Sequence, residues 1–164
     1  MFATPVGIKS YYVYFMKLEH GYYYVGITNN LGRRLQQHRN GRGSVITRAH
    51  RPLILLGSWY IGEMEYKEAE YIEDEFTLYF MQNYGDKVRG GRWCKNKENV
   101  AKVIRKNAVY CPCEQFEMVA HDVEISRHTE PKINKKSKKK QKIKMRKFKN
   151  RQEKVEWICT GKLL

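Results

Sequence analysis

The stretch YYVYFMKLEHGYYYVGITNNLGRRLQQH, residues 11–38, contains two alternating aromatic segments followed by a basic one. Residues 11–18 and 22–27 are rich in aromatic and β-branched residues, a composition that predicts two strands. Residues 19–21, Glu-His-Gly, form the turn between them, because glycine tolerates backbone angles that other residues disfavour. The stretch therefore predicts a β-hairpin.

A helix is predicted directly after the hairpin, at residues 31–40. Arg34 and His38 are four residues apart, so they lie on the same side of this helix. Alternate side chains of a strand share a face, and pairing of the two strands can bring Tyr14 close to Tyr24. We therefore expect two phenols, a guanidinium and an imidazole to converge at one end of a small sheet.

The middle of the chain predicts a third strand and further helices. We expect a basic loop at 41–52, a strand at 53–60, a long helix at 65–84, a loop at 88–93 and a short helix at 97–106. The expected fold is an α/β (α+β) domain with a three-stranded antiparallel sheet flanked by helices, followed by a basic low-complexity tail.

One acidic residue stands out in the predicted long helix. Ala69, Ile72, Phe76 and Phe80 form an apolar stripe at helical spacing, and Glu73 lies on the same side. Because an unpaired buried charge is costly, Glu73 is expected to face a cation, either an arginine or a metal ion.

Several short motifs follow one another in a characteristic order. They are YVY at 12–14, YVG at 24–26, ITNNLGRRLQQH at 27–38, GRGSVITRAHRP at 41–52, AEYIE at 69–73 and VRGG at 88–91. Together they resemble the GIY-YIG nuclease domain over about residues 10–93, with Tyr-Val-Tyr in place of Gly-Ile-Tyr. The VRGG segment is similar to a loop of viral and phage-type members.

The resemblance implies hydrolysis of DNA phosphodiester bonds with one divalent metal ion, Mg²⁺ or Mn²⁺. Glu73 would hold the metal, and Tyr14 or Tyr24 would activate or orient the attacking water. His38 would relay a proton, and Arg34 would pair with the scissile phosphate. These five residues are the expected catalytic set.

Basic residues concentrate at residues 132–151, which contain twelve Lys and Arg and no acidic residue, in a chain of net charge +15. Such a run predicts a DNA-binding tail or a nuclear localisation signal, and it raises non-specific DNA affinity at low salt. The residues expected to contact nucleic acid are Arg33, Arg42, Arg48, His50, Arg51, Arg89, Arg92, Lys138, Lys139 and Lys140.

The chain divides into four expected parts: a nuclease-like domain at 10–110, a cysteine-containing connector at 111–131, a basic disordered tail at 132–154 and a C-terminal segment at 155–164. A structural zinc site could use all four cysteines, Cys94, Cys111, Cys113 and Cys159. Their spacing differs from paired Cys-x-x-Cys motifs, so buried reduced thiols are the simpler expectation.

Three functions fit these patterns: an endonuclease, a non-catalytic nucleic-acid-binding module, and a subunit of a DNA repair or resolvase assembly. The complete set of predicted site residues favours the endonuclease. We expect DNA as the partner, with a protein partner or a homodimer as an addition, and neither a membrane nor a small-molecule cofactor. No signal peptide is visible and no apolar run reaches the roughly 20 residues of a membrane span. We therefore expect an intracellular protein of the cytoplasm or nucleus, the latter being the host nucleus for a viral protein.

Overall fold

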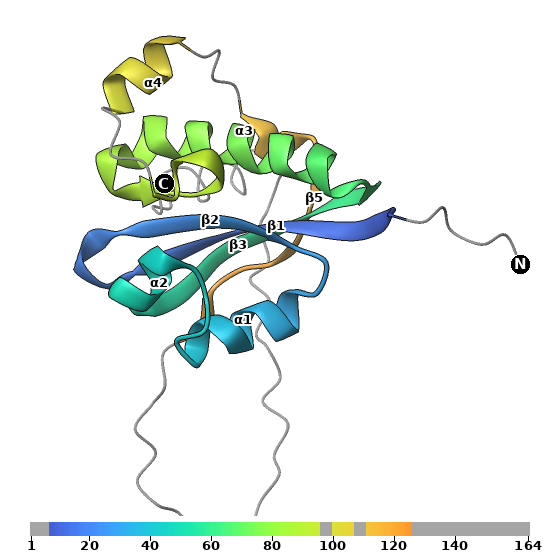
Figure 1. Ribbon diagram of the computed structural model, residues 1–164, viewed down its shortest axis with the longest axis horizontal. Helices are drawn as coiled ribbons and strands as arrows, with labels where there is room; N and C mark the ends of the chain where they lie inside the picture. Colours follow the sequence, from blue (N-terminus) through green and yellow to red (C-terminus); the bar gives the residue numbers. More distant parts are fainter. Residues whose placement is uncertain (1–6, 96–99, 107–110, 126–164) are drawn as a thin grey trace, which may run out of the picture.

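The computed structural model describes residues 7–95, 100–106 and 111–125, which form a central sheet with helices on both faces (Figure 1). Helix α3 and helix α4 lie over one face, and α1 and α2 lie over the other. The sheet positions side chains from both layers. The helices and strands have the following bounds: β1 Lys9–Leu18, β2 Tyr23–Thr28, α1 Leu31–Arg39, α2 Val45–Ala49, β3 Pro52–Met64, α3 Tyr66–Tyr84, β4 Val88–Arg89, α4 Val100–Lys106, β5 Glu117–Ala120 and β6 Val123–Glu124.

The predicted hairpin is present as β1 and β2, joined by a short 3-10 turn at Glu19–Gly21. His20 and Gly21 have positive φ angles of 59° and 72° in this turn. Strand β1 is central and pairs antiparallel with both β2 and β3. In this register Tyr14 lies opposite Gly26 on β2, which leaves room for the tyrosine ring.

The expected count of three strands is wrong, because the sheet of the described residues has six. Strand β4 pairs parallel with β2, and β5 and β6 pair antiparallel with β3. These extra strands are two to four residues long. Such segments are too short to show an alternating pattern, so their pairing depends on the neighbouring strand. Two of them come from the segment that the sequence predicted as a connector.

The helices follow local sequence signals. Helix α1 begins after Asn30, whose side chain accepts a hydrogen bond from Arg33 N at 2.9 Å. Helix α3 begins with a capping box between Glu65 and Glu68, and it ends before Gly85 at a φ of 80°. The segment predicted as a basic loop differs, because it contains the five-residue helix α2.

Each face of the sheet has its own apolar core. On the α3 face, the rings of Phe15 and Phe80 stack with centroids 3.8 Å apart. On the α1 face, Tyr14 and Tyr24 belong to a second buried cluster. Alternation along the strands therefore places both tyrosines on the side of the sheet that carries α1.

Some expectations concern residues beyond those described. The basic tail at 132–154, with Lys138, Lys139 and Lys140, and the segment at 155–164, with Cys159, lie outside the described residues. Within the described ranges, no helix combines the length and apolar content needed to cross a membrane.

Candidate active site

Three of the predicted catalytic side chains, Tyr14 of β1 and Arg34 and His38 of α1, form a hydrogen-bonded group. A hydrogen bond of 2.8 Å joins Tyr14 Oη and His38 Nε2, and Arg34 Nε donates to Tyr14 Oη at 3.0 Å. Arg34 also donates to Gln37 Oε1 at 3.1 Å. Tyr14 is fully buried and His38 is 1% exposed, so the group is fixed by packing as well as by hydrogen bonds.

Tyr24 completes this group as a third ring. Its centroid lies 6.0 Å from that of Tyr14 and 5.5 Å from that of His38. Its hydroxyl is a further hydrogen-bond partner of Arg34. A Cβ at Gly26 would lie 2.4 Å from Tyr14 Oη and 2.8 Å from Tyr24 Cε1, so only glycine lets both rings pack here. The structure thus brings together Tyr14, Tyr24, Arg34 and His38.

The sequence interpretation missed two residues that extend the group. Thr47 Oγ1 lies 2.9 Å from His38 Nδ1, and it donates to the backbone carbonyl of Ser44 at 3.1 Å. Both residues lie in the segment that was expected to be a loop. Their helical N-cap pattern, Ser44 three residues before Thr47, was the signal that could have indicated them.

Burial determines the protonation of this group. It is the main cause that raises the pKa of Tyr14 well above the usual value, with a further contribution from Tyr24, and it also raises the pKa of Tyr24. Burial and the neighbouring Arg34 lower the pKa of His38 to about 3. At neutral pH both phenols therefore keep their protons and the imidazole is uncharged.

Glu73 comes from α3, on the other side of the sheet, and is 8% exposed. Burial raises the pKa of its carboxyl to about 7, and a hydrogen bond from the backbone of Gly91 and the charge of Arg34 oppose this rise. In the described residues, ion pairs join Arg51 to Glu19 and Arg92 to Asp74, and neither includes Glu73. Glu73 is thus a buried carboxylate that makes no ion pair in the part of the chain that the structure describes, although the charge of Arg34 acts on it.

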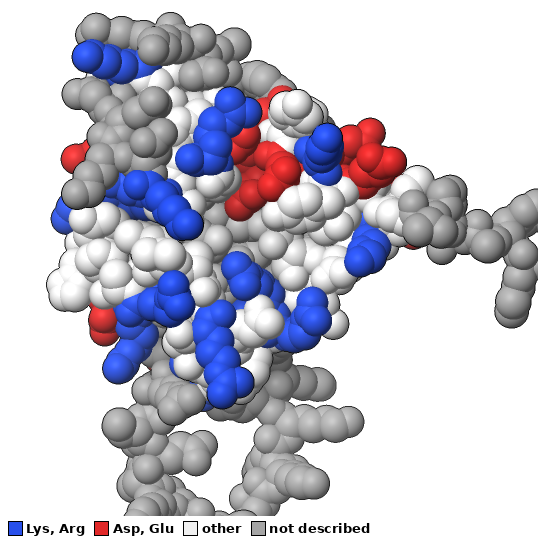
Figure 2. All heavy atoms as spheres, in the orientation of Figure 1, with Lys and Arg blue, Asp and Glu red and all other residues white. Residues whose placement is uncertain are grey.

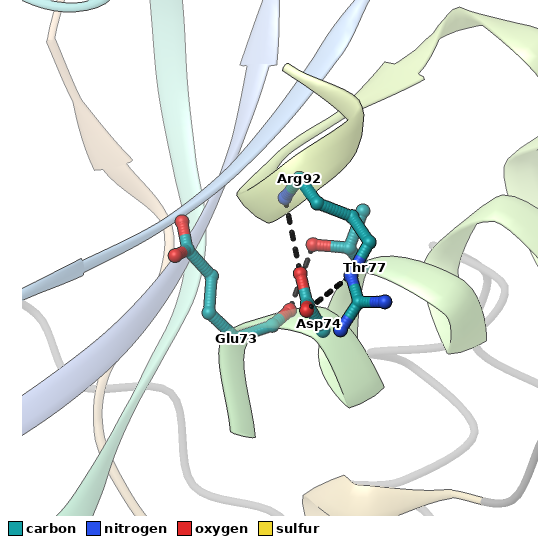
Figure 3. Close-up of polar contacts among 4 residues, drawn as sticks. All are labelled: Glu73, Asp74, Thr77 and Arg92. Carbon is teal, nitrogen blue, oxygen red and sulfur yellow. Dashed lines mark hydrogen bonds and ion pairs between the residues drawn. The ribbon is translucent and has the colours of Figure 1, made fainter. Parts of the chain in front are cut away.

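The neighbouring carboxylate has a different role. Arg92 donates to Asp74 through Nε at 2.7 Å and through its backbone N–H at 3.1 Å. Figure 3 shows Asp74 directed toward Arg92, whereas the Glu73 carboxylate points toward the strands. Of these two neighbouring acids, the geometry favours Glu73 as the one that faces the site.

Glu73 and Tyr24 line the same pocket, which has a volume of about 560 Å³. The side chains around them include Asp74, Arg92 and Cys94. The rings of Tyr14 and His38 pack next to the ring of Tyr24, with centroids 6.0 Å and 5.5 Å from it. The pocket therefore combines a carboxylate that makes no ion pair within the described residues with a neutral phenol, and the charge of Arg34 acts on both from outside the lining. This combination is suited to a divalent cation and a phosphate.

Comparison with known proteins agrees with the resemblance that the sequence motifs indicated. The family model described as the GIY-YIG catalytic domain matches residues 10–87. A UPF0213 protein of Bacillus licheniformis is 31% identical over 110 residues, which cover 66% of this chain and 97% of that protein. This chain belongs to the GIY-YIG family.

Other relatives match over a shorter length. UPF0213 proteins of Nitratidesulfovibrio vulgaris and Xanthomonas campestris are 44% and 46% identical over 62 and 50 residues. These matches cover 37% and 30% of this chain and 56% and 49% of the relatives, so the chain spans about half of their length. No solved structure matches significantly. The relatives are bacterial, and the similarity to viral and phage-type GIY-YIG members stays a prediction.

Basic side chains surround the α1 and α2 side of the GIY-YIG domain, and acidic ones gather over α3 (Figure 2). Arg33, Arg42 and Arg48 are exposed, as expected for residues that contact a polyanion. The other predicted nucleic-acid contacts are partly engaged within the protein: Arg51 with Glu19 at 4.0 Å, His50 stacked on Tyr22 at 3.9 Å, Arg89 with the carbonyls of Asp86 and Val88, and Arg92 with Asp74.

The described cysteines lie in two places. Cys94 lines the pocket, whereas Cys111 and Cys113 lie beside each other, within hydrogen-bonding distance, next to α3. The bond from the Cys113 thiol is the largest of the effects that lower the pKa of Cys111 to about 6. The described residues contain no group of three metal-ligating side chains. A four-cysteine zinc site stays untested, because Cys159 is outside these residues.

Proposed function

We propose that this GIY-YIG protein is a metal-dependent endonuclease that hydrolyses phosphodiester bonds of DNA. The observation that carries the proposal is the buried carboxylate of Glu73, which makes no ion pair among the described residues and shares a pocket with Tyr24. Arg34, hydrogen bonded to Tyr14 and Tyr24, lies beside that pocket. This grouping supplies a metal ligand, a phosphate ligand and a hydroxyl for the attacking water.

The residues of the pocket fit a magnesium or manganese ion. Glu73 offers a carboxylate oxygen, and its burial without an ion pair among the described residues makes its negative charge costly, even with the favourable charge of Arg34, unless a cation is bound. A pocket of about 560 Å³ leaves room for the water and phosphate oxygens that complete the coordination of Mg²⁺. When bound, the metal would polarise the phosphate and offset the charge that develops on it.

The chain's own residues have distinct roles in this proposal. Arg34 keeps its charge and offers guanidinium N–H groups to the scissile phosphate. Tyr24, the phenol that lines the pocket, orients the attacking water through its hydroxyl. Tyr14 and His38 hold Arg34 in place from behind, since Tyr14 accepts from Arg34 and is hydrogen bonded to His38.

Exposed arginines would guide DNA to this pocket. Arg33, Arg42 and Arg48 are exposed and would contact backbone phosphates on the α1 and α2 side. The basic run with Lys138, Lys139 and Lys140 would add sequence-independent affinity. Binding should therefore weaken steeply as the salt concentration increases.

Nicking of supercoiled plasmid tests the proposal. The wild-type protein and Glu73→Ala are compared with and without Mg²⁺, and Glu75→Ala on the same helix serves as the control for loss of one acidic charge. We expect nicking that requires Mg²⁺, disappears in Glu73→Ala and persists in Glu75→Ala. Binding of DNA by all three proteins without any nicking would instead support a non-catalytic binding module.

A further inference from the structure

Thr47 lies behind the proposed catalytic residues, in the short helix α2, and is 2% exposed. Its Oγ1 is 2.9 Å from Nδ1 of His38. We propose that Thr47 is a positioning residue that holds His38 in the tautomer protonated on Nδ1, so that Nε2 accepts the proton of Tyr14. The catalytic consequence of this tautomer rests on the proposed function, whereas the tautomer itself does not.

The hydroxyl of Thr47 has a single proton, and a backbone carbonyl can only accept one. Thr47 donates this proton to the carbonyl of Ser44 at 3.1 Å. The same oxygen can then meet His38 Nδ1 only as an acceptor. In this arrangement Nδ1 carries the ring proton, and Ser44 Oγ, 3.3 Å from Thr47 Oγ1, is a further partner of the hydroxyl.

The other side of the imidazole agrees with this assignment. His38 is uncharged at neutral pH because burial and Arg34 lower its pKa to about 3. With its one proton on Nδ1, the ring offers Nε2 as an acceptor, and Tyr14 Oη lies 2.8 Å away. Arg34 Nε can only donate, and it donates to the same Tyr14 oxygen at 3.0 Å. Each hydrogen bond on the path from Arg34 through Tyr14, His38 and Thr47 to Ser44 then has one donor and one acceptor.

The opposite tautomer, with the ring proton on Nε2, leaves one of these hydrogen bonds unmade. It would direct both His38 Nε2–H and Arg34 Nε–H at the oxygen of Tyr14. The Tyr14 hydroxyl proton, which is fully buried, would then have neither of these two groups as its acceptor. An unmade hydrogen bond at a buried hydroxyl costs about 1–3 kcal/mol in mutational studies.

Gly43 protects the contact between Thr47 and His38. A Cβ at this position would lie 2.1 Å from His38 Nδ1 and 2.5 Å from Thr47 Oγ1. The backbone of Gly43 therefore lies directly against this hydrogen bond, and a side chain at this position would displace one of the two partners. Titratable or charged groups that face the imidazole from the surrounding elements are Tyr14, Tyr24 and Arg34.

The tautomer determines what Tyr14 can do. Its proton points toward His38, and its lone pairs are directed at Arg34. Tyr14 thus orients the guanidinium as an acceptor, and Tyr24 is left as the phenol that faces the pocket. Thr47, three contacts away from Arg34, acts on the phosphate-binding group through His38 and Tyr14.

Nitrogen-15 spectroscopy of the full chain, without DNA or metal, tests the tautomer directly. Two-bond correlations from the carbon-bound ring protons give the shifts of both ring nitrogens, and loss of the signal in His38→Gln assigns it. We expect Nδ1 in the protonated, pyrrole-like range and Nε2 in the unprotonated, pyridine-like range. A wild-type spectrum with the proton on Nε2 would overturn the proposal.

Two variants of Thr47 separate positioning from simple packing. Thr47→Val keeps the shape of the side chain but removes the acceptor, and we expect the proton to move to Nε2 and plasmid nicking to slow by about 10- to 100-fold. Thr47→Ser keeps the hydroxyl and should restore both properties. An unchanged tautomer in Thr47→Val, or normal nicking despite a changed tautomer, would refute the positioning role. The predicted tautomer in a wild-type protein that cleaves no DNA would support the assignment and overturn the proposed function.

Discussion

Replacement of Glu73 by glutamine tests the electrostatics of the pocket. Glutamine has nearly the same shape as glutamate but no charge, so it removes the cost of a buried carboxylate. The pKa of Glu73 rises from 4.5 to about 7 in the folded protein, which corresponds to about 3 kcal/mol of folding free energy. Above pH 7 the wild type bears this penalty in full, and Glu73→Gln does not.

The sign of the pH dependence follows from proton binding. Between pH 4.5 and 7 the folded state holds more protons at Glu73 than the unfolded state, so this group lowers stability as the pH increases. His38 acts in the opposite direction: its pKa falls from 6.5 to about 3, so its contribution to stability is lost as the pH decreases through that range. The difference between wild type and Glu73→Gln cancels the contribution of His38 and isolates Glu73.

Urea unfolding at pH 5 and pH 8, without metal, measures this difference. We expect Glu73→Gln to gain up to about 3 kcal/mol relative to wild type between the two pH values. Addition of Mg²⁺ at pH 8 should stabilise the wild type, by about 2.7 kcal/mol at 100 times the dissociation constant, and leave Glu73→Gln unchanged. Glu75→Gln removes a charge from the same helix outside the pocket and is the control.

Two results would contradict the reasoning. A difference that does not vary with pH would mean that Glu73 ionises in an environment with solvent or a cationic side chain close by. Equal stabilisation of wild type and Glu73→Gln by Mg²⁺ would place the metal away from this carboxylate. The second result would remove the main support for the proposed chemistry.

Three further predictions concern packing, phosphate binding and the ion pair between Asp74 of α3 and Arg92. Gly26→Ala should cost about 1–3 kcal/mol and reduce nicking, because its Cβ would lie 2.4 Å from Tyr14 Oη. A Cβ at Gly32 would lie 3.8 Å from its nearest neighbour, Oδ1 of the N-cap Asn30, so Gly32→Ala should leave stability within about 1 kcal/mol of wild type or above it. Equal melting temperatures of the two variants would contradict this. Arg34→Lys should bind DNA like wild type in a filter assay but nick it at least about 10-fold more slowly. Lysine lacks the planar guanidinium, which can donate to Tyr14 and to a phosphate at the same time. Nicking at the wild-type rate would show that a single charge suffices. Asp74→Asn should weaken the 2.7 Å contact to Arg92 and lower stability by about 1 kcal/mol or less while Mg²⁺-dependent nicking persists, and complete loss of nicking would make Asp74 the metal ligand instead.

Elements with a clear local pattern were predictable from the sequence. The hairpin, α1 and α3 were expected within a few residues of their observed bounds, since alternation, helical spacing and cap residues act over short distances. The grouping of Tyr14 and Tyr24 with Arg34 and His38 was also expected, because strand pairing and the four-residue helical spacing place them on one side.

Elements whose formation depends on distant partners were missed. Strands β4, β5 and β6 form because β2 and β3 offer free edges, and a few residues carry no readable period. Helix α2 was taken for a loop because its five residues show no apolar stripe. The contact of Thr47 with His38 was missed for the same reason, as it joins residues of two helices that only the fold brings together.

The sequence by itself determined which chemical groups are available and on which local face each one lies. Periodicity and spacing depend on neighbours along the chain, so they can be read without a structure. Only the tertiary structure decided that Asp74 is paired with Arg92 while Glu73 is not, and that Glu73 and Tyr24 share a pocket. Ion pairing and desolvation depend on distances between elements that are far apart in the chain, and those distances exist only after the sheet has brought its two layers together.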